Sequence, residues 1–180
     1  MKGNRSMKIY LTNLGKYNEG YLIGKWVKLP VAENKLNEVL KEIGINEYYE
    51  EYFITDYENE IIGLGDVISE YSNVQALNKL AQRLEELSED EADKLGAVLE
   101  YEACRSVSDV LELLDELDDF DLLTDVNDDE ELGYYYAEEY CSIDIPEHVQ
   151  PYFDFEAFGR DVRLENSCLF TSYGFLLDNR

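Results

Sequence analysis

Hydrophobic and polar positions in the first sixty residues follow the periods of strands and of one helix. Segments 8–13 and 20–29 are rich in β-branched and aromatic residues and are separated by turn formers, which predicts a hairpin-like pair of strands. Pro30 ends the second strand, and apolar residues at helical spacing then predict a short helix over 36–43. Residues 49–57 favour a third strand. These elements together predict a small α+β unit.

Polar caps mark three predicted helices in the following fifty residues. In each cap a serine precedes, by three positions, a side chain that can reach back to it: Ser72 with Gln75, Ser88 with Glu91, and Ser106 with Asp109. Apolar stripes follow the first two caps: Val74, Leu77, Leu80, Ala81, Leu84 and Leu87, then Ala92, Leu95, Val98 and Leu99. The pattern therefore predicts a mainly helical middle segment.

The third predicted helix separates its residues by type. Its apolar positions fall within about 120° of arc at 100° per residue: Val107, Val110, Leu111, Leu114 and Leu117. A similar arc on the opposite side holds only carboxylates: Asp109, Glu112, Asp115, Glu116 and Asp119. A surface helix usually interleaves Glu with Lys to gain stabilising pairs, and this helix has none of them.

The final third of the chain predicts a second α+β unit. Residues 120–124 favour a short strand, and residues 130–141 favour a helix that carries the tyrosines Tyr134, Tyr135, Tyr136 and Tyr140. Residues 167–177 favour a strand pair that turns near Gly174. The three adjacent tyrosines cannot all face inward on one helix, so any that stay outside are candidates for a subunit contact.

The charge of the chain is strongly acidic and unevenly distributed. The 180 residues have a formal charge of -26, although residues 1–41 carry eight basic and only three acidic side chains. The 54 residues between Arg105 and Arg160 contain 18 acidic side chains and no Lys or Arg. With 15 Tyr and 7 Phe the composition is that of a folded protein, and its acidity argues against binding nucleic acid or anionic membranes. We expect a basic partner surface, the alternative being a solvated face that serves solubility.

Motifs for catalysis and for metal binding are missing. Both possible EF-hand registers, from Asp119 and from Asp125, fail at the glycine position, and His148 has no marked nucleophile. The cysteines Cys104, Cys141 and Cys168 lack zinc-site spacing. No apolar run approaches the ~20 residues of a membrane span. We therefore predict a cytoplasmic protein that is not an enzyme and needs no cofactor.

Rows of carboxylates can imitate the charge of DNA. Side chains three and four positions apart on a helix lie ~5 to 6 Å from each other, which is comparable to the separation of successive phosphates along one strand. Such a row would compete for the sequence-independent phosphate contacts of a DNA-binding groove.

Three segments resemble the ArdA family of antirestriction proteins. They are KIYLTNLGKYNEG at residues 8–20, EEYFITDYE at residues 50–58 and YFDFEAFGRD at residues 152–161. The resemblance runs from Met7 onward, and the basic residues 1–6 precede it. It implies a DNA mimic carried by mobile genetic elements, without covalent chemistry, that binds type I restriction-modification enzymes at their methyltransferase core in place of DNA.

The resemblance also implies an elongated homodimer whose chain forms three small domains. We expect an N-terminal α+β domain at 7–62, a helical middle domain at 63–104 and an acidic C-terminal α+β domain at 105–180. The antirestriction motif of the family falls near 132–141, close to the dimer contact, for which Tyr134 and Tyr140 are the candidates.

The predicted partner-binding surface consists of acidic residues from the middle and last thirds of the chain. They are Glu85, Glu86, Glu89, Asp109, Glu112, Asp115, Glu116, Asp118, Asp119, Asp121, Asp125, Asp128, Asp129, Glu130, Glu131, Glu138 and Glu139. Two other readings stay open: an acidic adaptor or inhibitor of a basic surface that does not bind DNA, and a carboxylate-dependent metal hydrolase, which would need a tight divalent-ion site.

Overall fold

The computed structural model describes residues 6–61, 63–140, 145–146 and 148–180. The described chain forms two compact units: the N-terminal unit, comprising residues up to 92 with 103–115, and the C-terminal unit, comprising 93–102 with 116–180. Each unit contains a three-stranded antiparallel sheet with helices, so the predicted α+β class is confirmed. The predicted division into domains 7–62, 63–104 and 105–180 stays a prediction.

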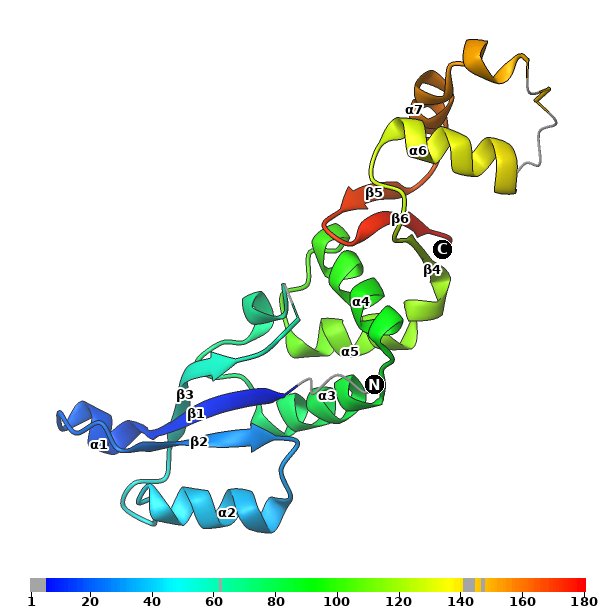
Figure 1. Ribbon diagram of the computed structural model, residues 1–180. Helices are drawn as coiled ribbons and strands as arrows, with labels where there is room; N and C mark the ends of the chain where they lie inside the picture. Colours follow the sequence, from blue (N-terminus) through cyan, green and yellow to red (C-terminus); the bar gives the residue numbers. More distant parts are fainter. Residues whose placement is uncertain (1–5, 62, 141–144, 147) are drawn as a thin grey trace. The chain divides into compact units, whose positions relative to one another are not determined.

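The sheet of the N-terminal unit has the predicted strands. Strands β1 (Met7–Asn13), β2 (Gly24–Leu29) and β3 (Tyr52–Glu58) are antiparallel, with β1 in the centre (Figure 1). Alternate residues on the strands are buried, among them Ile9, Leu11, Val27 and Leu29. The predicted hairpin is confirmed as a strand pair, but the short helix α1 (Leu14–Asn18) interrupts its connection.

Helices α2 (Glu33–Glu42), α3 (Val74–Glu86) and α5 (Val107–Asp115) belong to the N-terminal unit, and α4 (Glu89–Tyr101) is divided between the two units. Helix α2 follows the hairpin as predicted, and Gly44 ends it at a φ of +85° that glycine adopts without strain. Helix α4 passes into the C-terminal unit at Asp93. The predicted stripe on α3 is buried: Val74, Leu77, Leu80, Ala81 and Leu84.

The predicted helix caps are confirmed at two of three places. Ser88 and Glu91 exchange hydrogen bonds at the start of α4, with the Ser88 amide donating to Glu91 Oε2 at 2.6 Å. Before α3 the prediction is wrong by one residue, because the Asn73 side chain accepts from the Ala76 amide at 3.0 Å. The Ser72 hydroxyl instead accepts from the Ser69 amide at 2.9 Å.

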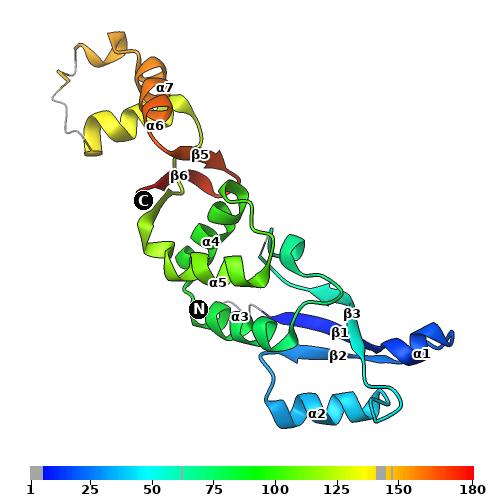
Figure 2. The ribbon, with the colours of Figure 1, turned by 180° about the vertical axis from the view of Figure 1, so that it is seen from behind.

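The sheet of the C-terminal unit also has the predicted strands. Strand β6 (Gly174–Asp178) pairs with β4 (Phe120–Leu123) on one side and β5 (Cys168–Thr171) on the other, both antiparallel (Figure 2). Helix α6 (Asp129–Tyr134) continues as a π-helix through Tyr135–Tyr140, so the helix predicted over 130–141 is confirmed within the described residues. Short 3₁₀ turns lie at Leu64–Val67, Leu117–Asp119 and Gln150–Tyr152.

Helix α7 (Phe155–Glu165) was not predicted, although its cap is visible in the sequence. The Asp154 side chain accepts from the Ala157 amide at 2.9 Å and starts the helix. The core of the unit gathers Val126, Leu132, Tyr136 and Phe175, against which Phe158 and Val162 of α7 pack. Burial of these apolar side chains is the main favourable contribution to folding of this unit.

Helices α6 and α7 are in backbone contact through two glycines. A Cβ atom added to Gly159 would lie 1.9 Å from the Asp129 carbonyl oxygen, and one added to Gly133 would lie 1.9 Å from the Phe155 carbonyl oxygen. No real atom pair tolerates these separations, so both positions exclude every side chain.

We expect Gly159→Ala to destabilise the protein by roughly 1–3 kcal/mol, because the added methyl forces α7 away from α6. Urea unfolding followed by circular dichroism measures the effect, with Asp161→Ala on the exposed side of the same helix as control. In an open helix the substitution of alanine for glycine would instead stabilise by up to about 1 kcal/mol. A stabilised variant would therefore contradict the backbone contact.

Candidate partner-binding surface

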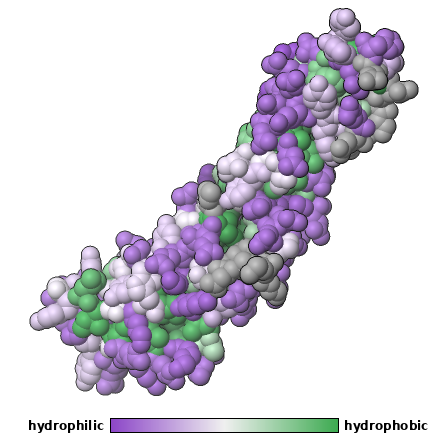
Figure 3. All heavy atoms as spheres, in the orientation of Figure 1, coloured by the Kyte–Doolittle hydropathy of each residue, from purple (hydrophilic) through white to green (hydrophobic). Residues whose placement is uncertain are grey.

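Most of the predicted carboxylates lie at the surface. Fourteen of the seventeen are exposed: Glu85, Glu86, Glu89, Glu112, Asp115, Glu116, Asp118, Asp119, Asp121, Asp125, Asp128, Glu130, Glu131 and Glu138. Asp109 and Asp129 are only partly exposed, and the Glu139 side chain lies outside the described residues. Figure 3 shows hydrophilic residues over most of the visible face where α6 and α7 lie. These exposed carboxylates are available to a partner.

The predicted separation of faces on α5 is observed with two changes. Val107, Val110 and Leu114 are buried as predicted, and Leu113 is buried too, while Leu111 is only half-buried. The helix ends at Asp115 and a 3₁₀ turn follows, so Glu116 and Asp119 do not belong to α5. The α-helical acidic face is therefore shorter than predicted, with Glu112 and Asp115 exposed three positions apart.

Asp109 serves the fold as a helix cap. Its carboxylate accepts from the amides of Arg105 at 2.8 Å and Ser106 at 3.0 Å, and from the Ser106 hydroxyl at 2.7 Å. The Ser106 hydroxyl accepts from the Asp109 amide in return, which completes the predicted capping box. These bonds, the one from Arg105 foremost, hold the pKa of Asp109 below its usual range.

Asp129 also serves the fold, through a partner far away in the sequence. Arg163 of α7 donates from Nε to Asp129 Oδ1 at 2.7 Å and from Nη2 to Asp129 Oδ2 at 2.9 Å. The paired geometry lowers the pKa of Asp129, with the Arg163 hydrogen bonds as the main cause. The ion pair ties α6 to α7 next to their glycine contact.

A second arginine gathers three carboxylates in the C-terminal unit. Arg180 pairs with Glu102, with Glu116 at 3.0 Å and with Asp178 at 2.8 Å, and its guanidinium lies 4.5 Å from the centre of the Phe120 ring. The pKa of Asp178 is lowered mainly by the Arg180 hydrogen bond. No sequence pattern predicts this cluster, because its members are separated by up to 78 positions.

Only some of the exposed carboxylates are engaged within the chain. Asp115 pairs with Arg83 at 2.7 Å, and Asp121 accepts from the Asn179 side chain at 2.9 Å. Asp128 caps α6 by accepting from the Glu131 amide at 2.9 Å. Within the described part of the chain, nine exposed carboxylates of the predicted surface form neither an ion pair nor a side-chain hydrogen bond: Glu85, Glu86, Glu89, Glu112, Asp118, Asp119, Asp125, Glu130 and Glu138. We call these nine the unpaired carboxylates.

Of the two tyrosines predicted for the dimer contact, the structure describes the side chain of Tyr134 only. The Tyr134 side chain is 43% exposed, and its ring stacks on Phe155 with centroids 3.7 Å apart and planes inclined by 16°. Tyr136 is buried in the core, as expected for one member of the tyrosine cluster. The Tyr140 side chain lies outside the described residues, and the dimer contact stays a prediction.

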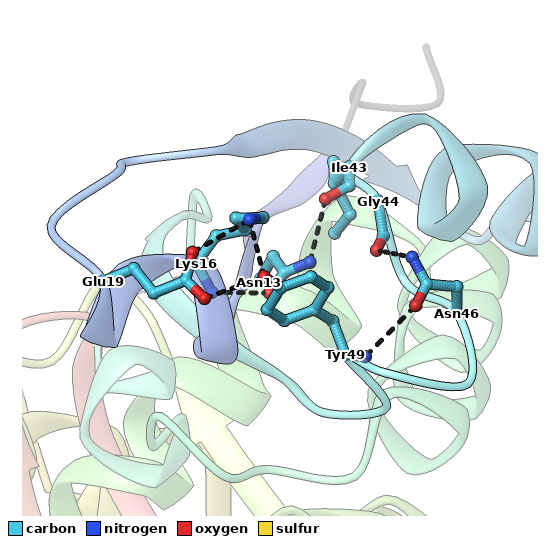
Figure 4. A network of polar contacts seen from close by, with 7 residues as sticks. All are labelled: Asn13, Lys16, Glu19, Ile43, Gly44, Asn46 and Tyr49. Atoms are coloured by element: carbon cyan, nitrogen blue, oxygen red, sulfur yellow. Dashed lines mark hydrogen bonds and ion pairs between the residues drawn. The ribbon is translucent and has the colours of Figure 1, made fainter.

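A polar cluster in the N-terminal unit contains part of the segment 8–20 (Figure 4). Buried Asn13 donates to the Ile43 carbonyl at 3.1 Å, while Lys16 Nζ donates to Glu19 at 2.8 Å and to the Tyr49 hydroxyl at 2.7 Å. The Tyr49 hydroxyl donates to the other oxygen of Glu19 at 2.7 Å. These bonds, the one to Glu19 first, raise the pKa of Lys16, and the closed cluster fixes α1 against the segment after α2.

The described residues offer no arrangement for metal chemistry. No group of three or more His, Cys, Asp or Glu side chains among them is placed to hold a metal ion. Within the same residues, no helix is both long enough and apolar enough to cross a membrane. Cys168 is a free thiol, and burial raises its pKa.

Comparison with protein families decides the relationship that these features suggest. A sequence model described as antirestriction protein (ArdA) matches residues 9–177, which span both units. The chain belongs to the ArdA antirestriction family. That family is non-enzymatic, and membership implies inhibition of restriction enzymes. No curated protein sequence matches the chain.

We expect Asp129→Asn to lower the free energy of unfolding at neutral pH and to flatten its acid dependence. A carboxyl whose folded pKa lies below its unfolded value of about 4 stabilises the fold above that value, and the contribution is lost as the pH falls through the folded pKa. The difference between wild type and variant should therefore shrink below about pH 4.

Urea unfolding at several pH values measures this difference, and Asp125→Asn, exposed and unpaired, is the control. General relief of repulsion as the acidic chain is protonated affects all three proteins alike and cancels. A difference between wild type and Asp129→Asn that stays constant down to pH 2 would contradict the assigned ion pair.

Proposed function

We propose that this protein inhibits type I restriction-modification enzymes as a DNA mimic. In this proposal its carboxylates occupy the groove of the methyltransferase core that otherwise binds DNA. The observation that carries the proposal is the stretch of 54 residues without Lys or Arg, in which most of the described carboxylates are exposed. Membership of the ArdA family supplies the class of target.

The charge pattern supports mimicry because a DNA-binding groove is built for regularly spaced negative charge. Glu112 and Asp115 are three positions apart on α5, and side chains at that spacing typically lie ~5 to 6 Å apart. Asp115 also pairs with Arg83. Contacts to phosphates position a protein on DNA and carry much of its affinity without reading bases. An acidic surface can replace those contacts without imitating base edges.

The unpaired carboxylates are the best candidates for contact with the target. A carboxylate already bound to an arginine of its own chain must break or share that interaction before it can bind a partner. Asp109 and Asp129 are committed to the fold, so we assign them a structural role instead. Asp115, Glu116, Asp121, Asp128 and Glu131 are exposed but engaged within the chain, and they contribute negative charge to the proposed surface.

The proposed target resides in the cytoplasm, where we expect the protein to act as a homodimer. Tyr134 supports a contact in the C-terminal unit, because a large aromatic ring that is 43% exposed is typical of interfaces. Its neighbours 132–141 are the segment in which the family motif is expected.

Displacement of labelled cognate DNA from a purified type I methyltransferase core tests the mimicry directly. We expect stoichiometric displacement by the protein, weakened by added salt because the contacts are ionic. Failure to displace DNA at high excess of folded protein would contradict the proposal. Binding to the enzyme that DNA cannot displace would favour an acidic inhibitor of a different basic surface.

The same titration tests which carboxylates carry the effect. The quadruple variant combines Glu112→Gln, Asp118→Asn, Asp119→Asn and Asp125→Asn, and we expect it to weaken displacement of DNA at least tenfold. Each single change should weaken displacement less than about threefold, because an exposed ion pair contributes ~0–1 kcal/mol. The matched control neutralises four exposed residues elsewhere: Glu47, Glu50, Glu51 and Glu60. Equal loss in both variants would assign the effect to net charge alone.

We expect Tyr134→Ala to weaken dimerisation and Tyr134→Phe to preserve it, because the ring supplies the apolar contact area. Sedimentation velocity at micromolar protein measures the oligomeric state. Since Tyr134 also stacks on Phe155, the unfolding of each variant is measured in parallel. Unchanged sedimentation of a folded Tyr134→Ala variant would exclude this residue from the subunit contact.

A further inference from the structure

One face of the N-terminal sheet carries an aromatic row beside a carboxylate. Trp26, Tyr10 and Asp56 are cross-strand neighbours on β2, β1 and β3. They alternate with the buried residues Ile9 and Val27, so they belong to the opposite face of the sheet. The rings of Tyr10 and Trp26 meet edge to face with centroids 5.3 Å apart.

These residues line a groove of about 540 Å³ within the N-terminal unit. Tyr17 and Phe53 form another part of its wall, with their rings edge to face at 5.2 Å. Glu70 also lines the groove, and its carbonyl accepts from the Ile54 amide of β3 at 2.8 Å, which holds Glu70 beside the sheet. The groove is thus walled by four aromatic rings and contains two carboxylates.

The two carboxylates of the groove have no counter-ion within the described residues. Neither Asp56 nor Glu70 forms an ion pair there, although the segment that holds β1, α1 and β2 is rich in lysine. Three nearby lysines are already paired, Lys8 with Glu58, Lys16 with Glu19 and Lys25 with Glu42. The net charge of the residues that line the groove is therefore negative.

We infer that this groove binds an arginine side chain presented by a protein partner. A guanidinium group is planar and always charged, stacks on aromatic rings, and donates hydrogen bonds in a fork that suits carboxylates. The groove offers both kinds of surface together, whereas the compact lysine ammonium would use only its charge. This second binding surface goes beyond the proposed DNA mimicry and does not depend on it.

The single tryptophan of the chain reports directly on the groove, because Trp26 is 39% exposed and lines it. We expect titration with Nα-acetyl-arginine amide at moderate salt to change the Trp26 fluorescence saturably. The neutral isostere Nα-acetyl-citrulline amide should produce no saturable change. A probe with a single arginine is used because an arginine-rich peptide would bind nonspecifically to the whole acidic surface.

Matched variants separate the groove from general attraction to an acidic protein. Asp56→Asn with Glu70→Gln should raise the dissociation constant for the arginine probe at least tenfold. Glu47→Gln with Glu50→Gln removes the same charge from exposed positions outside the groove and should leave the constant unchanged. Circular dichroism establishes that each variant is folded.

Several outcomes would overturn the inference. Equal weakening in both double variants would show diffuse attraction, and equal binding of the citrulline probe would show that the groove accepts apolar groups regardless of charge. Saturable binding of Nα-acetyl-glutamate amide in place of arginine would show that the neighbouring lysines dominate. None of these results bears on displacement of DNA from a methyltransferase, so failure here and failure of the proposed function are distinguishable.

Discussion

Repulsion among its own carboxylates constrains how this chain folds. With 41 acidic and 15 basic side chains, the protein cannot neutralise its charge by local pairing. Two of the three arginines in the last third link separate elements: Arg163 pairs α7 with α6, and Arg180 pairs with Glu102 and Glu116. Each arginine therefore attracts the carboxylates around it and reduces the repulsion among them.

The hydrophobic period was sufficient to predict most elements. Strands β1, β2 and β3 and helices α2 to α5 followed from alternation and helical stripes, because each buries one face against a core. Helix α7 escaped prediction because Gly159 interrupts its apolar stripe, and that glycine is explained only by the carbonyl of Asp129 on another helix. The helical connection α1 escaped because it depends on a side-chain cap from Asn13 at the end of a strand.

The candidate surface was predictable in composition but not in detail. Exposure of the carboxylates followed from their number, since charged groups stay in water unless they are paired. Asp109 and Asp129 both have structural roles, but only the role of Asp109 can be predicted from the sequence. The cap formed by Asp109 is local and was recognised as a spacing of three, whereas the pairing of Asp129 with Arg163 joins residues 34 positions apart and requires the fold. The groove around Trp26 likewise combines residues from three strands, helix α1 and two connecting segments.

The unpaired carboxylates have a consequence for how such a sequence can change over generations. Because no backbone amide or arginine of the described chain depends on them, aspartate and glutamate are interchangeable there, and a lost acid can be compensated by a new one nearby. Gly133, Gly159 and Arg163 have no such freedom. Related sequences should therefore differ widely in which acidic residues occupy this surface, while its negative charge persists. Similarity searches should detect the contact between α6 and α7 more readily than the surface that binds the target.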